Sequence, residues 1–145
     1  MQSKCLYKQK KLVDQLQPEI GEKELYQKII QMGKELSPLQ KEERIAANLV
    51  KGCQSQTYLV SEFVMLEGGV KTLFFRAESD ALISAGLAAL LIQVYAGESP
   101  DTILTCPPVF LQQLRLDKLL TPNRANGLYS MHVKMKQLAL VSLTG

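Results

Sequence analysis

The chain has 145 residues, which is long enough to bury a hydrophobic core in one domain and leaves little room for a second. Hydrophobic residues make up 46% and charged residues 21%, values typical of a globular protein and not of a disordered or fibrous one. The net charge of +3 is mild, and with 6% aromatic residues and no basic stripe the sequence does not indicate nucleic-acid binding. We therefore treat residues 1–145 as a single domain.

The first twenty residues contain a cluster of basic side chains, Lys4, Lys8, Lys10 and Lys11. Chain termini are poorly ordered unless something ties them down, so we predict a flexible, solvated basic segment over residues 1–20. No apolar stretch of the secretory type follows this basic start. The longest uncharged run, residues 81–96, is shorter than the ~20 residues of a membrane span, so we expect no membrane partner.

The three cysteines, Cys5, Cys53 and Cys106, are an odd number without C-x-x-C spacing. This pattern suggests neither a disulfide framework nor a zinc site, and it favours a reducing, cytoplasmic compartment. Cys5 lies in the predicted flexible segment and Cys106 precedes two prolines, so we interpret both as structural or incidental.

The first predicted helix is amphipathic, because Leu25, Ile29, Met32 and Leu36 recur at helical spacing before Ser37-Pro38 closes the segment. A shorter helical piece is expected over residues 40–47. Residues 57–66 and 71–77 are rich in β-branched and aromatic side chains and flank Glu67-Gly68-Gly69, which predicts a β-hairpin. A third strand is not clearly marked.

The remaining chain predicts helices. Ser79 is interpreted as the N-cap, Asp80 as a first-turn acid and Gly97 as the C′ residue of a long helix that is apolar nearly all round and should therefore be central. Ser99-Pro100 opens another helix, which Cys106-Pro107-Pro108 interrupts.

A short helix is expected over residues 109–115, and Thr121-Pro122 should begin the last helix, with Leu128, His132, Met135 and Leu138 on one face. The order of elements indicates an α+β fold, with a small antiparallel sheet packed with helices on one side.

The pentapeptide Gly52-Cys53-Gln54-Ser55-Gln56 is the place where exposed sulfur chemistry is expected. A thiol is an effective nucleophile only as thiolate, which requires partial exposure and hydrogen-bond donors or a nearby cation. Lys51, Gln54 and Ser55 could supply these, and Gly52 allows a tight turn and close approach by another backbone or by a bulky side chain of a partner. From the residues alone, a small buried structural cysteine remains the alternative.

Three segments together resemble the SufE family of sulfur-acceptor proteins: residues 48–58 (NLVKGCQSQTY), 75–81 (FRAESDA) and 120–128 (LTPNRANGL). Their order and spacing are similar to the family's, over about residues 25–138. The chain departs from the family in having Thr57-Tyr58 where relatives usually show Val-Trp. The resemblance implies a SufE/IscU-like α+β sandwich.

The resemblance also implies a function. Cys53 would accept sulfur from the persulfide of a pyridoxal-phosphate (PLP) cysteine desulfurase of the SufS/CsdA type, stimulate that enzyme, and deliver the sulfur to a SufB-type iron–sulfur scaffold. The protein would then be a sulfurtransferase-type carrier and not a free-standing hydrolase, with no metal or cofactor of its own, since PLP belongs to the partner. No acid–base pair is obligatory, because persulfide exchange follows the logic of thiol–disulfide exchange.

Two further residues are interpreted as partner-binding. Arg124 lies in the first turn of a predicted helix, where a cation opposes the helix dipole, and it falls within the third family-like segment. Asp80 is a weaker candidate.

Two alternatives stay open at this point. His132 is the only histidine, so a Cys53–His132 dyad of a small cysteine hydrolase or acyltransferase is the second hypothesis. The third hypothesis is a non-covalent adaptor in which the cysteine is incidental.

Overall fold

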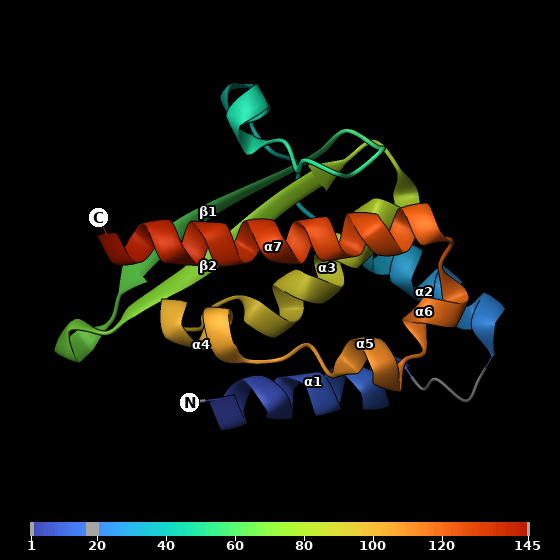
Figure 1. Ribbon diagram of the computed structural model, residues 1–145, viewed down its shortest axis with the longest axis horizontal. Coiled ribbons are helices and arrows are strands. Elements are labelled where there is room, and N and C mark those ends of the chain that lie inside the picture. Colours follow the sequence, from blue (N-terminus) through green and yellow to red (C-terminus); the bar gives the residue numbers. More distant parts are fainter. Residues whose placement is uncertain (1, 17–20, 145) are drawn as a thin grey trace.

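The computed structural model describes residues 2–16 and 21–144. Its elements are helices α1 (Gln2–Leu16) and α2 (Glu22–Lys34), strands β1 (Thr57–Met65) and β2 (Lys71–Ser79), and helices α3 (Leu82–Tyr95), α4 (Pro100–Thr105), α5 (Phe110–Gln113), α6 (Leu116–Leu119) and α7 (Pro122–Thr144). Figure 1 shows the two strands as one long ribbon, with α7 running beside them and α1 at the opposite side of the molecule. The predicted α+β class is therefore confirmed.

The strands form a two-stranded antiparallel hairpin, paired from Thr57 with Ser79 to Met65 with Lys71. The 3₁₀ turn Glu67–Gly69 closes it. Gly68 and Gly69 adopt positive φ angles of 83° and 79°, which glycine tolerates without steric cost. The hairpin prediction is confirmed, and the described residues contain no third strand.

Helix α3 is the centre of the molecule, as its apolar sequence predicts. It contacts β2, α1, α2 and α7. Its fully buried side chains include Leu87, Leu90, Leu91, Val94 and Tyr95. Alternate residues of β2, namely Leu73, Phe75 and Ala77, are buried too, so one face of the hairpin joins the core.

Helices α2 and α3 cross at two glycines. A Cβ atom built on Gly33 would lie 2.4 Å from the backbone N of Gly86, and one built on Gly86 would lie 2.3 Å from the carbonyl O of Ile29. The two backbones therefore approach more closely than any larger residue would permit. Helix α2 ends at Lys34, before Leu36, which the sequence had placed within it.

The N-terminal segment is not the flexible basic tail that we predicted. Residues 2–16 form α1, in which Leu12 and Leu16 are buried. The Lys8 ammonium lies 2.5 Å from the Glu98 carboxylate, which is only 5% exposed, and also donates to the Ala96 carbonyl. An apolar stripe and one partly buried ion pair thus tie the segment down. Residues 1 and 17–20 of this prediction lie outside the described part of the chain.

The sequence also failed to predict a disulfide. Cys5 on α1 and Cys106 after α4 are bonded, with their Cα atoms 6.7 Å apart and a sequence separation of 101. Beside the bond, the buried Gln9 side chain donates to the Pro107 carbonyl and accepts from the Phe110 amide, both at 2.9 Å. This pairing is tertiary, so cysteine spacing could not reveal it. Cys53 remains the free cysteine.

The start of α3 differs from the prediction as well. Ser79 is the last residue of β2, and Asp80 precedes the helix, whose N-cap is Ala81. Cross-strand pairing with Thr57 keeps Ser79 extended. By contrast, Ser99 caps α4 as expected, since its hydroxyl accepts from the Thr102 amide.

The last helix, α7, begins at Pro122 as predicted and buries Leu128, His132 and Met135 on one side. The His132 ring stacks on Tyr95, with the ring centroids 5.1 Å apart. No helix among residues 2–16 and 21–144 is both long and apolar enough to cross a membrane.

Candidate functional site

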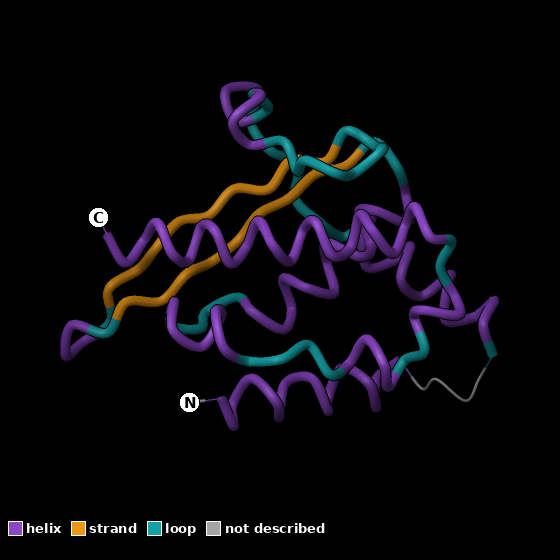
Figure 2. Tube along the Cα trace, in the orientation of Figure 1, coloured by secondary structure: helices purple, strands orange, loops and turns teal. Residues whose placement is uncertain are grey.

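The cysteine loop, residues 50–56, is fastened at both ends. The Val50 amide donates to the Thr57 carbonyl at 2.8 Å. At the other end, the Gln56 amide donates to the Asp80 carboxylate at 3.0 Å, and the Asp80 amide donates to the Gln56 carbonyl at 3.1 Å. Figure 2 shows this loop in teal at the end of the strands away from the hairpin turn. The loop therefore has a fixed base from which Cys53 projects.

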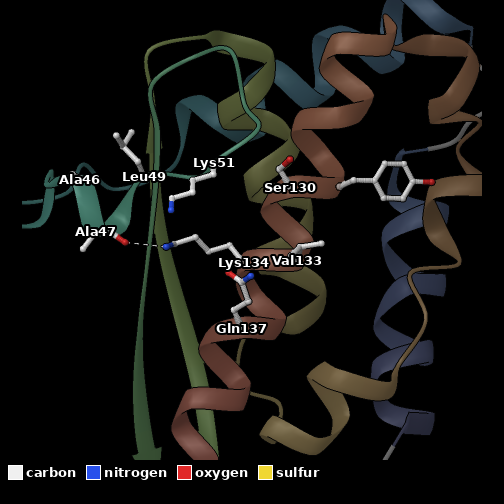
Figure 3. Close-up of a pocket in the computed structure, with 9 residues that line it drawn as sticks. Ala46, Ala47, Leu49, Lys51, Ser130, Val133, Lys134 and Gln137 are labelled. Carbon is white, nitrogen blue, oxygen red and sulfur yellow. Dashed lines mark hydrogen bonds between the residues drawn. The ribbon is translucent and has the colours of Figure 1, made fainter.

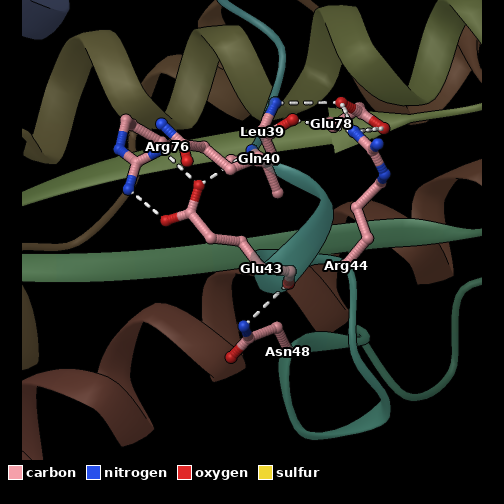
Figure 4. Close-up of polar contacts among 7 residues, drawn as sticks. All are labelled: Leu39, Gln40, Glu43, Arg44, Asn48, Arg76 and Glu78. Carbon is pink, nitrogen blue, oxygen red and sulfur yellow. Dashed lines mark hydrogen bonds and ion pairs between the residues drawn. The ribbon is translucent and has the colours of Figure 1, made fainter.

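Charged side chains hold the preceding segment on β2 (Figure 4). The Arg76 guanidinium donates to both oxygens of Glu43, which lowers the pKa of that carboxyl to about 2. Arg44 likewise pairs with Glu78 at 3.2 Å, and Asn48 donates to the Glu43 carbonyl. The expected helical piece over residues 40–47 is a pair of 3₁₀ turns, Lys41–Glu43 and Ala46–Asn48. These contacts hold the segment that precedes the cysteine loop in one conformation.

The Cys53 thiol is half-buried at one end of a chain of hydroxyl groups. Its Sγ lies 3.2 Å from Ser55 Oγ and 3.4 Å from Thr57 Oγ1. Ser55 in turn donates to Ser84 at 3.1 Å, and Thr57 lies 2.8 Å from the Ser79 hydroxyl. Because the single hydroxyl proton of Ser55 goes to Ser84, the Thr57 hydroxyl is the one placed to donate a hydrogen bond to the Cys53 sulfur.

Two glycines allow the loop to pack against α7. A Cβ atom on Gly127 would lie 3.2 Å from Cys53 Sγ. Gly52 has a φ of +90°, and a Cβ there would lie 2.5 Å from Ser130 Oγ. The group close to Gly52 is therefore the Ser130 side chain of α7, and not another backbone or a partner's side chain as we predicted. Glycine at both positions leaves the thiol room beside the helix.

Cys53 opens into a cleft of about 390 Å³. The cleft is lined by Cys53, Gln54, Ser55, Ala81, Ser84, Thr121, Asn123, Arg124 and Gly127. Among the described residues, Arg124 is the only charged side chain in this lining, and its guanidinium donates to the Tyr26 hydroxyl on α2. A polar cleft with one cation and one free thiol suits the chemistry of an anionic sulfur species.

The structure brings most of the predicted site residues together. Gln54 and Ser55 line the cleft with Cys53, and Arg124 closes one side of it. Lys51 does not belong to this cleft; its side chain lines a separate groove. The Asp80 carboxylate accepts a hydrogen bond from the Gln56 amide and so has a structural role in stabilising the loop.

His132 does not join Cys53. It is 6% exposed, stacked on Tyr95 in the core, and absent from the lining of the cysteine cleft. The hydrogen-bond partners of the Cys53 thiol within the described chain are hydroxyl groups. Burial and the nearby Lys136 lower the pKa of His132 to about 4, so it is neutral near pH 7. The geometry gives no support to a Cys53–His132 dyad.

Sequence reasoning missed the hydroxyls of Thr57, Ser79 and Ser84 and the role of Gly127. A signal for one of them was present, because Cys53, Ser55 and Thr57 alternate in sequence, and alternate residues of an extended chain share a face. Ser84 and Gly127 come from distant helices and carried no such signal.

The structure is thus an α+β fold with a free, half-buried cysteine on a loop that precedes the hairpin and packs against α7. The family model described as SufE, Fe–S metabolism associated domain, matches residues 10–139. The chain therefore belongs to the SufE family, and the resemblance seen in its sequence is confirmed.

Individual relatives agree with this assignment. The chain is 37% identical over 135 residues to an uncharacterised SufE-like protein of Synechocystis, covering 93% of this chain and 82% of that protein. It is 34% identical over 115 residues to SufE-like protein 1, chloroplastic/mitochondrial, of Arabidopsis thaliana, covering 79% of this chain. That match spans only 30% of the Arabidopsis protein, so the larger protein's properties are not carried over.

Among solved structures, the solution structure of a hypothetical protein from Thermus thermophilus superposes with a TM-score of 0.71. It is 24% identical and covers 95% of this chain and 97% of its own. This likeness establishes the fold.

Proposed function

We propose that Cys53 accepts a sulfur atom from the persulfide of a PLP-dependent cysteine desulfurase and carries it to an iron–sulfur scaffold. The observation that supports this best is the state of the three cysteines. Cys5 and Cys106 are bonded to each other, whereas Cys53 is free and opens into a polar cleft. Membership of a family associated with Fe–S metabolism supplies the context.

The transfer step needs no oxidant. The Cys53 thiolate attacks the outer sulfur of the donor persulfide, a new S–S bond forms on Cys53, and the donor cysteine leaves as a thiolate. The Thr57 hydroxyl lies where it can donate to the attacking thiolate and then to the persulfide. A second exchange would pass the sulfur on: a thiolate of a SufB-type scaffold would attack the outer sulfur of the Cys53 persulfide, and Cys53 would leave as a thiolate. Stimulation of a SufS/CsdA-type desulfurase would follow from removal of its persulfide product.

The test is intact-mass analysis after the protein is mixed with a cysteine desulfurase and free cysteine. We expect a gain of one sulfur, which peptide mapping places on Cys53, because that cysteine is the free one. The Cys53→Ser variant, with its disulfide intact, is the matched control and should gain none. Sulfur on Cys5 or Cys106 with Cys53 unmodified would contradict the proposal. Normal stimulation of the desulfurase by Cys53→Ser would favour a non-covalent adaptor.

Arg124 is proposed as a contact with the desulfurase. It is exposed at the cleft, and in the described chain it forms no ion pair, since its guanidinium bonds the neutral Tyr26 hydroxyl. We expect Arg124→Ala to weaken desulfurase binding by about 2–5 kcal/mol if the charge is buried in the complex, and by much less at a rim. Titration calorimetry measures this.

Arg124→Lys and Tyr26→Phe are the matched controls for that measurement. The lysine variant keeps the charge and should retain part of the affinity, whereas the phenylalanine variant removes only the internal hydrogen bond. Slower alkylation of Cys53 in Arg124→Ala with unchanged affinity would place Arg124 in the thiol's own environment instead. Asp80 would be a second contact only if Asp80→Asn weakens binding without loosening the loop.

The compartment stays a prediction. We predicted the cytoplasm because the cysteine spacing suggested no disulfide. The Cys5–Cys106 bond contradicts that premise for two of the three cysteines. Cys53 must nevertheless be reduced to accept sulfur, so the proposed function requires reducing conditions at that residue.

A further inference from the structure

A second concave surface, separate from the Cys53 cleft, adjoins the cysteine loop at Lys51. This groove, of about 700 Å³, runs between the 3₁₀ turn Ala46–Asn48 and helix α7. It is lined by Ala46, Ala47, Leu49, Lys51, Tyr129, Ser130, Val133, Lys134 and Gln137. Figure 3 shows Lys51 and Lys134 extending into the space between the loop and the helix, one from each wall. We call it the lysine groove.

The lysine groove carries an uncompensated positive charge. No aspartate or glutamate contributes to its lining, and neither lysine forms an ion pair in the described chain. Lys134 donates only to the neutral Ala47 carbonyl, at 3.0 Å. The neighbouring cations Arg44 and Arg76 differ in this respect, because Glu78 and Glu43 neutralise them.

The groove also has an apolar part. Val133 is 50% exposed on the face of α7 that forms one wall. An apolar side chain next to cations is typical of a protein-binding surface, because the apolar group supplies contact area and the charges supply orientation. Its walls are fixed in relation to each other by the Lys134 hydrogen bond and by the close approach of Gly52 to Ser130.

We infer that the lysine groove binds an acidic segment of the protein that exchanges sulfur with Cys53, with carboxylates on Lys51 and Lys134 and an apolar side chain against Val133. This inference rests on the proposed function for the choice of partner. Lys51 is two residues from Cys53, so a segment held in the groove would keep its own protein next to the thiol. The charge of the groove, and not its size, selects the occupant.

The first experiment uses a fluorescein-labelled peptide in which glutamates alternate with leucines, and measures its affinity by fluorescence anisotropy. We expect the Lys51→Glu/Lys134→Glu variant to bind it roughly tenfold more weakly or worse, because each substitution replaces an attraction with a repulsion. Binding to the unmodified protein should weaken with added salt. A peptide with glutamine in place of glutamate should bind poorly.

The matched control is Lys4→Glu/Lys10→Glu, which makes the same change in net charge at two exposed positions of α1. An equal loss of affinity in this control would overturn the inference, since it would show attraction to net charge alone. Lys51→Gln/Lys134→Gln guards against misfolding, because it removes the charges without adding repulsion. Tighter binding of single-stranded DNA or of phosphatidylserine vesicles through the same two lysines would also overturn it.

A second measurement separates this inference from the proposed function. With a cysteine desulfurase as the sulfur donor, the glutamate variant should need a higher donor concentration for half-maximal labelling of Cys53 but reach the same rate at saturation if the desulfurase is the groove's partner. Unchanged dependence on the desulfurase, with a loss of transfer to a scaffold, would assign the groove to the acceptor. Peptide binding without any sulfur uptake on Cys53 would refute the proposed function and leave the groove as a docking site. Sulfur uptake on Cys53 with no peptide binding would support the proposed function and refute the lysine groove as a docking site.

Discussion

Replacing Gly86 with alanine is expected to lower the free energy of unfolding by about 3 kcal/mol, at the upper end of the usual cost of overpacking. The added Cβ would lie 2.3 Å from the Ile29 carbonyl O and 2.6 Å from Ile29 Cγ2. A backbone atom of a packed helix cannot move aside as a flexible side chain can, so α2 and α3 would have to separate. Urea unfolding followed by circular dichroism measures the change.

The sign of that result is informative, because alanine is favoured over glycine by about 1 kcal/mol inside a helix when nothing collides with it. Gly127→Ala in α7 is the matched control. Its Cβ would meet only the Cys53 thiol, at 3.2 Å, so we expect little loss of stability. A Gly86→Ala protein as stable as the unmodified one would mean that the two helices pack less closely than the structure shows. Gly33→Ala should resemble Gly86→Ala, since it would add the clash from the other helix.

Acidification from pH 6.5 towards pH 4 is expected to lower the stability by roughly 2–3 kcal/mol through His132 alone. Burial and Lys136 lower the pKa of His132 to about 4 in the folded protein, against an ordinary value of 6.5. In this window the unfolded chain binds a proton that the folded protein does not. The contribution of the neutral, buried ring is therefore complete above about pH 6.5 and is lost as the pH falls to about 4.

The control is His132→Phe, which keeps a ring against Tyr95 but cannot bind a proton. Its unfolding free energy should be nearly independent of pH between 6.5 and 4.5, compared with a slope of about 1.4 kcal/mol per pH unit in the unmodified protein. Glu43 does not confuse this comparison, because both proteins contain it and its contribution is lost mainly below pH 4.5, between its ordinary pKa of 4.5 and the folded pKa of about 2 that Arg76 imposes. Equal slopes in the two proteins would show that His132 takes up its proton over the same pH range in the folded and unfolded states, so that its pKa is not lowered by folding.

Local sequence patterns predicted the elements whose determinants lie close together in the chain. The β-rich runs around Gly68-Gly69 became the hairpin, Ser99-Pro100 began α4, and Pro122 began α7. The pattern failed at Ser79, where a good cap residue is instead the last residue of a strand. Pairing with Thr57 across the hairpin outweighs the local preference, because it extends the ladder that positions the whole strand.

In the candidate site, too, local sequence predicted some features and not others. The family-like motif around Cys53 identified the thiol and its neighbours Gln54 and Ser55, all of which line one cleft. The side chain of Lys51 could not be placed from sequence, because a residue two positions before Cys53 in the loop can point to either side of it. It points into the lysine groove, and the cation beside Cys53 comes from Arg124, seventy-one residues further along.

By itself, the sequence determined the α+β class and the family and singled out Cys53 as the candidate thiol, because these depend on periodicity and on short motifs within one segment. Only the tertiary structure decided the partners of the three cysteines. Cys5 and Cys106 are bonded at a sequence separation of 101, and Cys53 meets Ser84 of α3 through Ser55 and Gly127 of α7 directly. The physical reason is that such contacts arise from the packing of α1, α3 and α7, and no local pattern records which distant residues that packing brings together.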